Sequence, residues 1–477
     1  MFRRARLLLL AALMSLVGLL AVGTPVQAAS VTLLNATQFT DNTGAVVHAH
    51  GGGVIRVGSY YYWFGENRNA DNTFKAVSVY RSTDLKTWEF RRDVLTQSSD
   101  PELAVANIER PKVIFNSTTG KFVMWMHKEN GGDYNEARAA VAVSDTVDGD
   151  YTWQGSFRPL GYMSRDITLF RDDDGTGYMI SAANNNRDLH VYRLTGDYLG
   201  VESRVQLLWP GQLREAPAMF KRDGVYFLLT SGATGWNPNQ QKYATASSVT
   251  GTWSALQNVG DATAYGSQTA YVLPVQGTAR TEYLYMADRW GNSFGQNVNA
   301  SKYVWLPLEF PTDTTMTMDW FPQIAIDTAA GTVDGVGGPW ESLTARHSGK
   351  CLDVPGKSAD DGVQLTQYTC NGGMNQAYWF KDMGGAYVQL MAEHSGKCLD
   401  VSDNSTSNGA PVVQWPCSSG TNQQWQLQDA GQGHVRLVSR SSGKCLDISG
   451  ASTANGAKLI QWTCGTGTNQ QFQRHTG

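Results

Sequence analysis

The chain has 477 residues, of which 17% are charged and 11% are aromatic, and its formal net charge is −4 at pH 7. This length is enough for two or three domains. A mildly acidic protein is a poor match for nucleic acid or for an anionic membrane surface, so neither is expected as a partner.

Residues 1–28 have the pattern of a secretory signal. Arg3, Arg4 and Arg6 precede an apolar run from Leu7 to Val22, and the small residues that end at Ala28 fit a cleavage site. The alternative is a membrane anchor, but the run is short for a span of about 18 or more apolar residues. We therefore expect a secreted, extracellular protein with no membrane attachment after cleavage. Paired cysteines persist in that oxidising environment.

Residues 29–333 contain five stretches with one shared pattern: a polar residue, a strand, a tight turn and a second strand. The stretches are His50 to Glu66, Glu109 to Met126, Asp166 to Ser181, Glu215 to Ser231, and Gln268 to Ala287. Further polar strands fill the spaces between them. A repeat of about 50 residues with about four strands per unit predicts an all-β fold, a five-bladed β-propeller. A β-sandwich is the alternative.

Polar residues head the first strand of each predicted blade. Because these innermost strands run toward the propeller axis, their heads would converge on one funnel. Four of the heads carry a carboxylate or an amide, namely Glu109, Asp166, Glu215 and Gln268. Glycoside hydrolysis needs an acid for the leaving oxygen and a second group that handles water on the opposite face of the sugar. The heads therefore indicate a glycosidase.

Residues 30–330 resemble glycoside hydrolase family 43. The resemblance is carried by Asp166 with the segment Ile167 to Gly175, and by the segment Glu215 to Ser231. It implies that Glu215 is the general acid. It also implies that Asp166 orients this acid and raises its pKa, since a nearby negative charge favours the protonated form.

The chain departs from the usual pattern of that family at the first strand head. It reads His48 to Gly53 where the family usually carries an aspartate base. With Glu109 to Lys112 and Tyr265 to Gln268, this departure is similar to the exo-β-1,3-galactanase subfamily. The resemblance implies that Gln268 holds the attacking water or acts through its imidic-acid tautomer, and that Glu109 binds the terminal galactose. Glu109 also remains a candidate base.

Four further residues are expected to contact substrate: Glu66, Tyr134, Trp236 and His50. A cation held by His48 and His50 is the less favoured interpretation, and no metal or cofactor is predicted.

A glycine-rich linker is predicted at residues 334–339. Residues 340–477 then contain three copies of Gly-Lys-Cys-Leu-Asp, 47 residues apart. Each copy has an acid, an aromatic residue and an Asn-Gln pair at constant offsets, which indicates one structural unit used three times with three similar sugar sites.

The three copies resemble a ricin-type β-trefoil, carbohydrate-binding module family 13. Gln-x-Trp-like elements close the last two copies, at 423–425 and 470–472. The resemblance implies three sites of four residues each. These are Asp353, Tyr368, Asn375 and Gln376; Asp400, Trp415, Asn422 and Gln423; and Asp447, Trp462, Asn469 and Gln470. The alternative is that some of these amides only stabilise the trefoil core.

All six cysteines lie in these repeats, two in each copy. Six cysteines allow 15 pairings, but the repeat favours pairing within a copy. The expected disulfides are Cys351–Cys370, Cys398–Cys417 and Cys445–Cys464. Residues 29–350 contain no cysteine, which excludes a thiol nucleophile and a cysteine-zinc site there.

Together these features predict a monomeric, inverting exo-β-1,3-galactanase that acts on β-1,3-galactan or arabinogalactan and reaches the polysaccharide through its trefoil. An arabinofuranosidase or β-xylosidase of the same family is one alternative, against which the missing aspartate base argues. A non-catalytic sugar-binding protein is the other, and the retained Glu215 and Asp166 argue against it.

Overall fold

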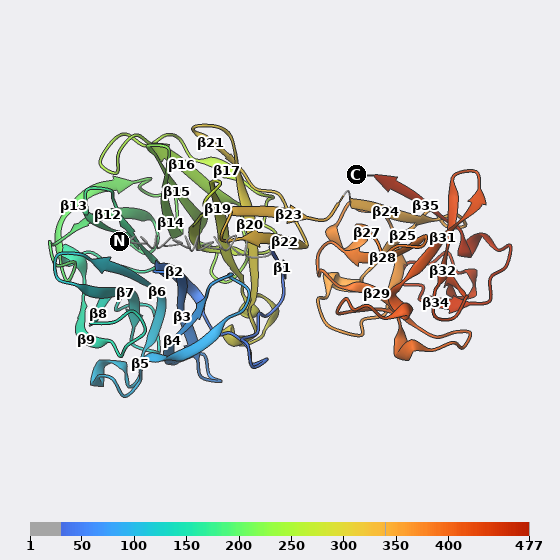
Figure 1. Cartoon of the computed structure of the whole chain (residues 1–477), viewed down its shortest axis with the longest axis horizontal. Helices are drawn as coiled ribbons and strands as arrows, with labels where there is room; N and C mark the ends of the chain where they lie inside the picture. Colours follow the sequence, from blue (N-terminus) through green and yellow to red (C-terminus); the bar gives the residue numbers. More distant parts are fainter. Residues whose placement is uncertain (1–29, 339, 477) are drawn as a thin grey trace, which may run out of the picture.

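The computed structural model describes residues 30–338 and 340–476, which form an N-terminal part and a C-terminal part (Figure 1). The predicted signal at residues 1–28 lies outside the described residues. The described residues form 35 strands and ten short 3₁₀ turns, so the prediction of an all-β fold is confirmed. Within these same ranges, no helix has the length and apolar character needed to cross a membrane.

Five four-stranded antiparallel sheets make up most of the N-terminal part. The first contains β2 (His50–Val57), β3 (Tyr60–Arg68), β4 (Phe74–Ser82) and β5 (Glu89–Thr96). The second contains β6 (Asn107–Asn116), β7 (Lys121–Glu129), β8 (Arg138–Ser144) and β9 (Thr152–Phe157). The third contains β10 (Ile167–Arg171), β11 (Gly177–Ala183), β12 (Asp188–Leu194) and β13 (Val201–Leu208).

The last two four-stranded sheets complete the series. The fourth contains β14 (Arg214–Arg222), β15 (Val225–Gly232), β16 (Gln241–Ala246) and β17 (Gln257–Val259). The fifth contains β18 (Gln268–Gln276), β19 (Thr281–Arg289), β20 (Lys302–Thr312) and β21 (Thr315–Thr317). The first strands of the five sheets pack side by side, β2 on β6, β6 on β10, β10 on β14, β14 on β18 and β18 on β2, in a propeller arrangement.

A sixth sheet was not predicted. It has three strands, β1 (Val31–Leu34), β22 (Gln323–Asp327) and β23 (Thr332–Val336). Our prediction of five blades is therefore one sheet short. The pairing of Val31 with Ile326 joins the two ends of this part of the chain, so a local repeat in the sequence could not predict this sheet. β23 also takes up residues 334–336, which we had assigned to the linker.

A cluster of aromatic side chains joins the first sheet to the fifth. The ring centroid of Trp63 lies 5.1 Å from that of Trp88 and 5.1 Å from that of Trp305, and all three rings are buried. Large aromatic rings bury the most apolar surface per residue, so this cluster contributes much of the packing that closes the ring of sheets.

The C-terminal part contains the remaining twelve strands, which are hydrogen-bonded into one network (Figure 1). The strands are β24 (Trp340–Ala345), β25 (Cys351–Asp353), β26 (Thr366–Tyr368), β27 (Tyr378–Asp382), β28 (Tyr387–Ala392), β29 (Cys398–Val401), β30 (Val412–Trp415), β31 (Trp425–Gly431), β32 (His434–Ser439), β33 (Cys445–Ile448), β34 (Leu459–Trp462) and β35 (Phe472–Thr476).

The three sequence copies occupy equivalent places in this part. Leu352, Leu399 and Leu446 of the repeated motif are all fully buried in one core. The three predicted disulfides are present, one within each copy: Cys351–Cys370, Cys398–Cys417 and Cys445–Cys464. This arrangement is trefoil-like.

Candidate active site

A cavity of about 440 Å³ opens at the heads of the innermost strands. Seven of the eight predicted catalytic and substrate-binding residues line it: Glu66, Glu109, Tyr134, Asp166, Glu215, Trp236 and Gln268. The cavity is therefore the place where any reaction that uses the predicted carboxylates must occur.

The eighth residue, His50, does not line the cavity, and the prediction that it binds substrate is wrong. Its side chain is fully buried. Its Nδ1 lies 2.8 Å from Oδ1 of Asp288, and its ring stacks on Tyr303 at a centroid distance of 4.8 Å. These contacts hold the first sheet against the fifth. His50 therefore has a structural role that its position at a strand head did not reveal.

Four innermost strands change register at their first residues. These β-bulges set the direction in which the side chains at the strand heads point. In β6 the irregularity lies between Glu109 and Lys112, and in β14 between Glu215 and Ala218. The residue after each glutamate has a positive φ, 53° at Arg110 and 49° at Ala216. Such left-handed conformations are costly for residues other than glycine and cluster at functional sites.

Glu215 is only 7% exposed, and each of its carboxyl oxygens accepts a hydrogen bond from an amide. Gln268 Nε2 donates to Oε1 at 3.0 Å, and Asn186 Nδ2 donates to Oε2 at 2.8 Å. Burial, and then the negative charge of Asp166, raise the pKa of Glu215 to about 8. Glu215 is thus protonated at neutral pH. Because both of its neighbours are donors, its own proton stays available for a leaving group.

Asp166 immediately precedes β10 and does not touch the Glu215 carboxyl group through a hydrogen bond. Its Oδ2 accepts from the backbone N–H of Ala216 at 3.0 Å and lies 3.0 Å from Arg110 Nε. Asp166 therefore acts on Glu215 in two ways. Its charge raises the pKa of the acid, and its hydrogen bond fixes the backbone of the next residue.

The side-chain amide of Gln268 has four hydrogen bonds. Oε1 accepts from Arg110 Nη2 at 2.6 Å and from Trp290 Nε1 at 2.8 Å. Nε2 donates to Glu215 Oε1 at 3.0 Å and to Ser231 Oγ at 2.9 Å. These bonds use both donors and both lone pairs of a primary amide. The imidic-acid tautomer has its proton on Oε1, where both neighbours are donors that cannot accept it.

Glu109 is ionised, in contrast to Glu215. Its Oε1 accepts from Arg68 Nη2 at 2.9 Å and from the Tyr134 hydroxyl at 2.6 Å, and its Oε2 lies 3.1 Å from His127 Nδ1. Burial alone would raise the pKa of Glu109, but the hydrogen bond from His127 and the charge of Arg68 lower it well below its usual range. A carboxylate stabilised in this way is a weak base, which argues against Glu109 as the catalytic base.

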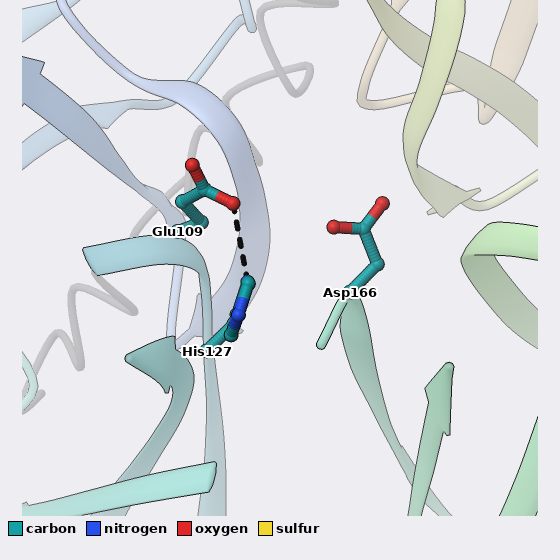
Figure 2. A group of neighbouring side chains, drawn as sticks. All are labelled: Glu109, His127 and Asp166. Atoms are coloured by element: carbon teal, nitrogen blue, oxygen red, sulfur yellow. Dashed lines mark hydrogen bonds and ion pairs between the residues drawn. The ribbon is translucent and has the colours of Figure 1, made fainter. Parts of the chain in front are cut away.

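Glu109, His127 and Asp166 lie close enough for one ligand atom from each to fall within 4.8 Å of the others. Figure 2 shows the side chains of Glu109 and His127 next to each other, joined by a dashed line, and the side chain of Asp166 apart from both. Burial lowers the pKa of His127, but hydrogen bonds to Glu109 and Glu129 raise it to about 9. A protonated histidine offers no lone pair to a metal. The group therefore fits a network of ion pairs rather than a cation site.

Glu66 is tied to this network from the first sheet. Its Oε2 accepts from Arg68 Nε at 3.0 Å, and its Oε1 accepts from the backbone N–H of Arg110 at 2.9 Å. A Cβ atom on Gly51 would lie 2.3 Å from Oε1 of Glu66, and the φ of Gly51 is 60°. Glycine at this strand head therefore makes room for the carboxylate beside it.

Several lining residues were missed: Arg68, Arg110, His127, Arg165, Asn186, Leu213 and Trp290, among others. Arg68 had a usable signal, because residues two apart on a strand share a face and Glu66 had been selected. Arg110 and Trp290 had no such sequence signal, since Gln268, to which both donate a hydrogen bond, lies on another strand.

The trefoil residues are arranged in three matching sets. In each, one aspartate oxygen accepts from the Asn and the Gln of the same copy, at 2.7–2.9 Å. Each Gln amide also donates to a backbone carbonyl, so it is fully used as a donor. The aspartates are buried, whereas Tyr368, Trp415 and Trp462 are 44%, 47% and 45% exposed. The glutamines thus hold the aspartates in place, and the aromatic faces are open to solvent.

The sequence matches two family patterns. That of the glycosyl hydrolases family 43 covers residues 49–278. That of the ricin-type beta-trefoil lectin domain-like family covers three overlapping segments, 332–415, 383–462 and 421–477.

Two solved structures are similar to nearly the whole chain. An exo-β-1,3-galactanase from Clostridium thermocellum is 46% identical, covers 94% of this chain and 100% of its own, and has a TM-score of 0.66. An exo-β-1,3-galactanase from Phanerochaete chrysosporium, solved with β-1,3-galactotriose, is 27% identical. The match covers 93% of this chain and 100% of that one, and its TM-score is also 0.66.

Curated relatives match a shorter region. A xylan 1,3-β-xylosidase from a Vibrio species is 23% identical over 198 residues, which is 37% of this chain and 35% of that protein. The chain thus spans about a third of the length of this relative.

The pKa of Glu215 can be tested without a substrate. Titration of the chain labelled with ¹³C in its glutamate carboxyl groups should give a resonance with a midpoint near pH 8, because burial and Asp166 disfavour the anion. In the Asp166→Asn variant this midpoint should fall, since a negative charge is removed. The Glu215→Gln variant identifies the resonance. A Glu215 midpoint near that of an ordinary glutamate, about 4.3, would contradict our assignment of its environment.

Proposed function

Because the chain belongs to glycoside hydrolase family 43, we propose that it is an inverting exo-β-1,3-galactanase that cleaves terminal β-1,3-galactosyl linkages of galactan or arabinogalactan. The observation that carries this proposal is the buried Glu215 carboxyl group, which lines one cavity with Asp166, Glu109 and Gln268 and whose pKa is raised by burial and by Asp166. The likeness to two exo-β-1,3-galactanases over more than nine-tenths of the chain supports the choice of substrate.

In the proposed reaction Glu215 gives its proton to the glycosidic oxygen as the bond from that oxygen to C1 breaks. A water molecule attacks C1 from the opposite face, which inverts the configuration. The carboxyl groups of inverting enzymes lie about 6.5–9.5 Å apart. Gln268 Nε2 is only 3.0 Å from Glu215 Oε1 in the free site, so substrate must enter between them before Gln268 can orient the water.

Gln268 is a neutral amide, so it positions the water and takes no proton from it. The transition state of this reaction resembles an oxocarbenium ion, and the attacking water can lose its proton to solvent as the new bond forms. Glu109 is ionised and held by Arg68, Tyr134 and His127, which suits a carboxylate that accepts hydrogen bonds from sugar hydroxyl groups.

We also propose a division of labour along the chain. Residues 29–336, which include β23, cut the substrate, residues 337–339 connect, and residues 340–477 bind the polysaccharide. Tyr368, Trp415 and Trp462 offer aromatic faces for stacking on sugar C–H groups. Three such sites raise the effective concentration of the enzyme on a polymer. The three disulfides suit secretion to an oxidising environment, in which the protein acts as a monomer.

A xylosidase or arabinofuranosidase activity is the second candidate, and the likeness to a xylan 1,3-β-xylosidase favours it. That likeness covers little more than a third of the chain at 23% identity, so it carries less weight than the match to the galactanases.

The substrate is tested directly with the purified full chain. We expect galactose to be released from β-1,3-galactobiose, and release from aryl xyloside and aryl arabinofuranoside to be much slower. Glu215→Gln should lower kcat by about 10²–10⁴ or more, because the amide has no proton to donate. Asp223→Asn, in an exposed turn, is the control and should have no effect. Preferential hydrolysis of the xyloside would overturn the proposed specificity.

The role of Gln268 is tested by kinetics on the same disaccharide. Gln268→Ala removes the group that orients water, so kcat should fall by about 10² or more while KM changes little. A higher KM with unchanged kcat would mean that Gln268 only binds the sugar. The midpoint of the Glu215 titration should be measured in this variant as well, because Gln268 also donates to that acid.

The trefoil is tested with the double variant Trp415→Ala, Trp462→Ala. Loss of two aromatic platforms should weaken binding to long galactan by about 10² or more through lost avidity, while hydrolysis of the disaccharide stays unchanged. Phe90→Ala is the control, since Phe90 is an equally exposed aromatic residue of the N-terminal part, at 44%. Equal losses on both substrates would contradict the division of labour.

A further inference from the structure

A second cavity, of about 350 Å³, lies at the junction of the two parts of the chain. We call it the junction cavity; its charged and titratable lining residues are Arg289 and Lys302 from the N-terminal part, and Lys357, Asp360 and His394 from the trefoil. Hydrogen bonds fix the two walls. Arg289 Nη1 donates to the carbonyl of His394 at 3.0 Å, and Trp320 Nε1 donates to the carbonyl of Glu393 at 2.8 Å.

The lining of the junction cavity has three cations against one carboxylate, and Asp261 is a second carboxylate near Arg289. Arg289 on β19 stands directly opposite Lys302 on β20 in the strand register. Like charges in opposite positions destabilise a sheet. Burial, and then the charge of Arg289, lower the pKa of Lys302. An anion between these two residues would remove this repulsion.

One buried side chain of this lining, Arg289, has a polar atom without a partner among the described residues, its Nε. Arg289 is 8% exposed and His394 is 4% exposed. Buried donors and acceptors are normally hydrogen-bonded, so unpaired ones that line a cavity point to a ligand. Burial lowers the pKa of His394 to about 4, so its ring is neutral. Its Nε2 donates to the carbonyl of Ser358 at 2.9 Å, and the carbonyl of Met374 also faces the ring, so the trefoil backbone holds this side chain in place.

The junction cavity lies next to the active-site cavity. Trp236 and Trp290 line the active-site cavity, whereas Pro238 and Gly291 line the junction cavity. The same two short segments therefore separate the two spaces. A saccharide with its end in the active-site cavity could place a side group or a neighbouring chain in the junction cavity.

We propose that the junction cavity binds a carboxylate-bearing monosaccharide unit, a uronic acid. Arg289 and Lys302 bind the carboxylate. A neutral sugar would leave the repulsion between these two cations in place. The suggestion that this unit belongs to the polysaccharide substrate rests on the proposed function, whereas the binding site itself does not.

Binding is measured by calorimetry on the full-length Glu215→Gln chain, so hydrolysis plays no part. The probe is methyl β-D-glucuronide, and the matched neutral sugar is methyl β-D-glucopyranoside. We expect the glucuronide to bind at least about tenfold more tightly than the neutral sugar. Lys302→Met should weaken glucuronide binding by about tenfold, and Lys357→Met, at an exposed position, should weaken it by a smaller factor. Lys444→Met, in the third trefoil copy, should not change it.

Equal affinity for the two sugars would overturn the proposal. So would glucuronide binding that survives Lys302→Met, or that is lost in the Trp415→Ala, Trp462→Ala variant, since the site would then be on the trefoil platforms. Failure of the galactobiose assay with retained glucuronide binding would refute the proposed activity and leave the junction site intact. The reverse result would refute the junction site alone.

Discussion

The contacts of the Arg110 guanidinium group hold the rest of the active site in place. It comes from the second sheet, pairs with Asp166 at the head of the third, and donates to Gln268 and to the backbone of Thr269 in the fifth. One cation thus holds three blades at the propeller centre. Its planar fork of donors suits this task better than a lysine ammonium. Arg110 has a positive φ, and this unfavourable backbone conformation is the cost of directing its side chain toward these partners.

Burial around this cation gives two glutamates opposite roles. Glu215 sits beside Asp166 with only amide donors on its oxygens, so its pKa rises to about 8 and it keeps a proton. Glu109 faces Arg68 and a protonated His127, so its pKa falls and it stays ionised. In a site of low dielectric the neighbouring charges decide which carboxyl group is the acid.

The trefoil repeat and the junction cavity extend recognition beyond the active site in different ways. The three trefoil platforms are nearly equal in exposure, which suits many weak contacts along one polymer. The junction cavity lies where trefoil residues 356–360, Met374 and His394 face the N-terminal part. The second repeat carries Glu393 where the first and third carry Arg346 and Arg440, and its backbone carbonyl accepts a hydrogen bond from Trp320.

The all-β class, the strand heads that meet in the cavity and the within-copy disulfides could all be predicted from the sequence, because each depends on a short repeat or on a polar residue before a strand. The sixth sheet could not be predicted in this way, because its strands come from opposite ends of the domain and meet only in the folded protein. Folding also buries His50 against Asp288 and Tyr303, engages the trefoil glutamines fully as donors, and places Arg110 between Asp166 and Gln268. All of these features share one cause. Burial, pairing and protonation depend on residues that are distant in the chain, so a local sequence pattern cannot predict them.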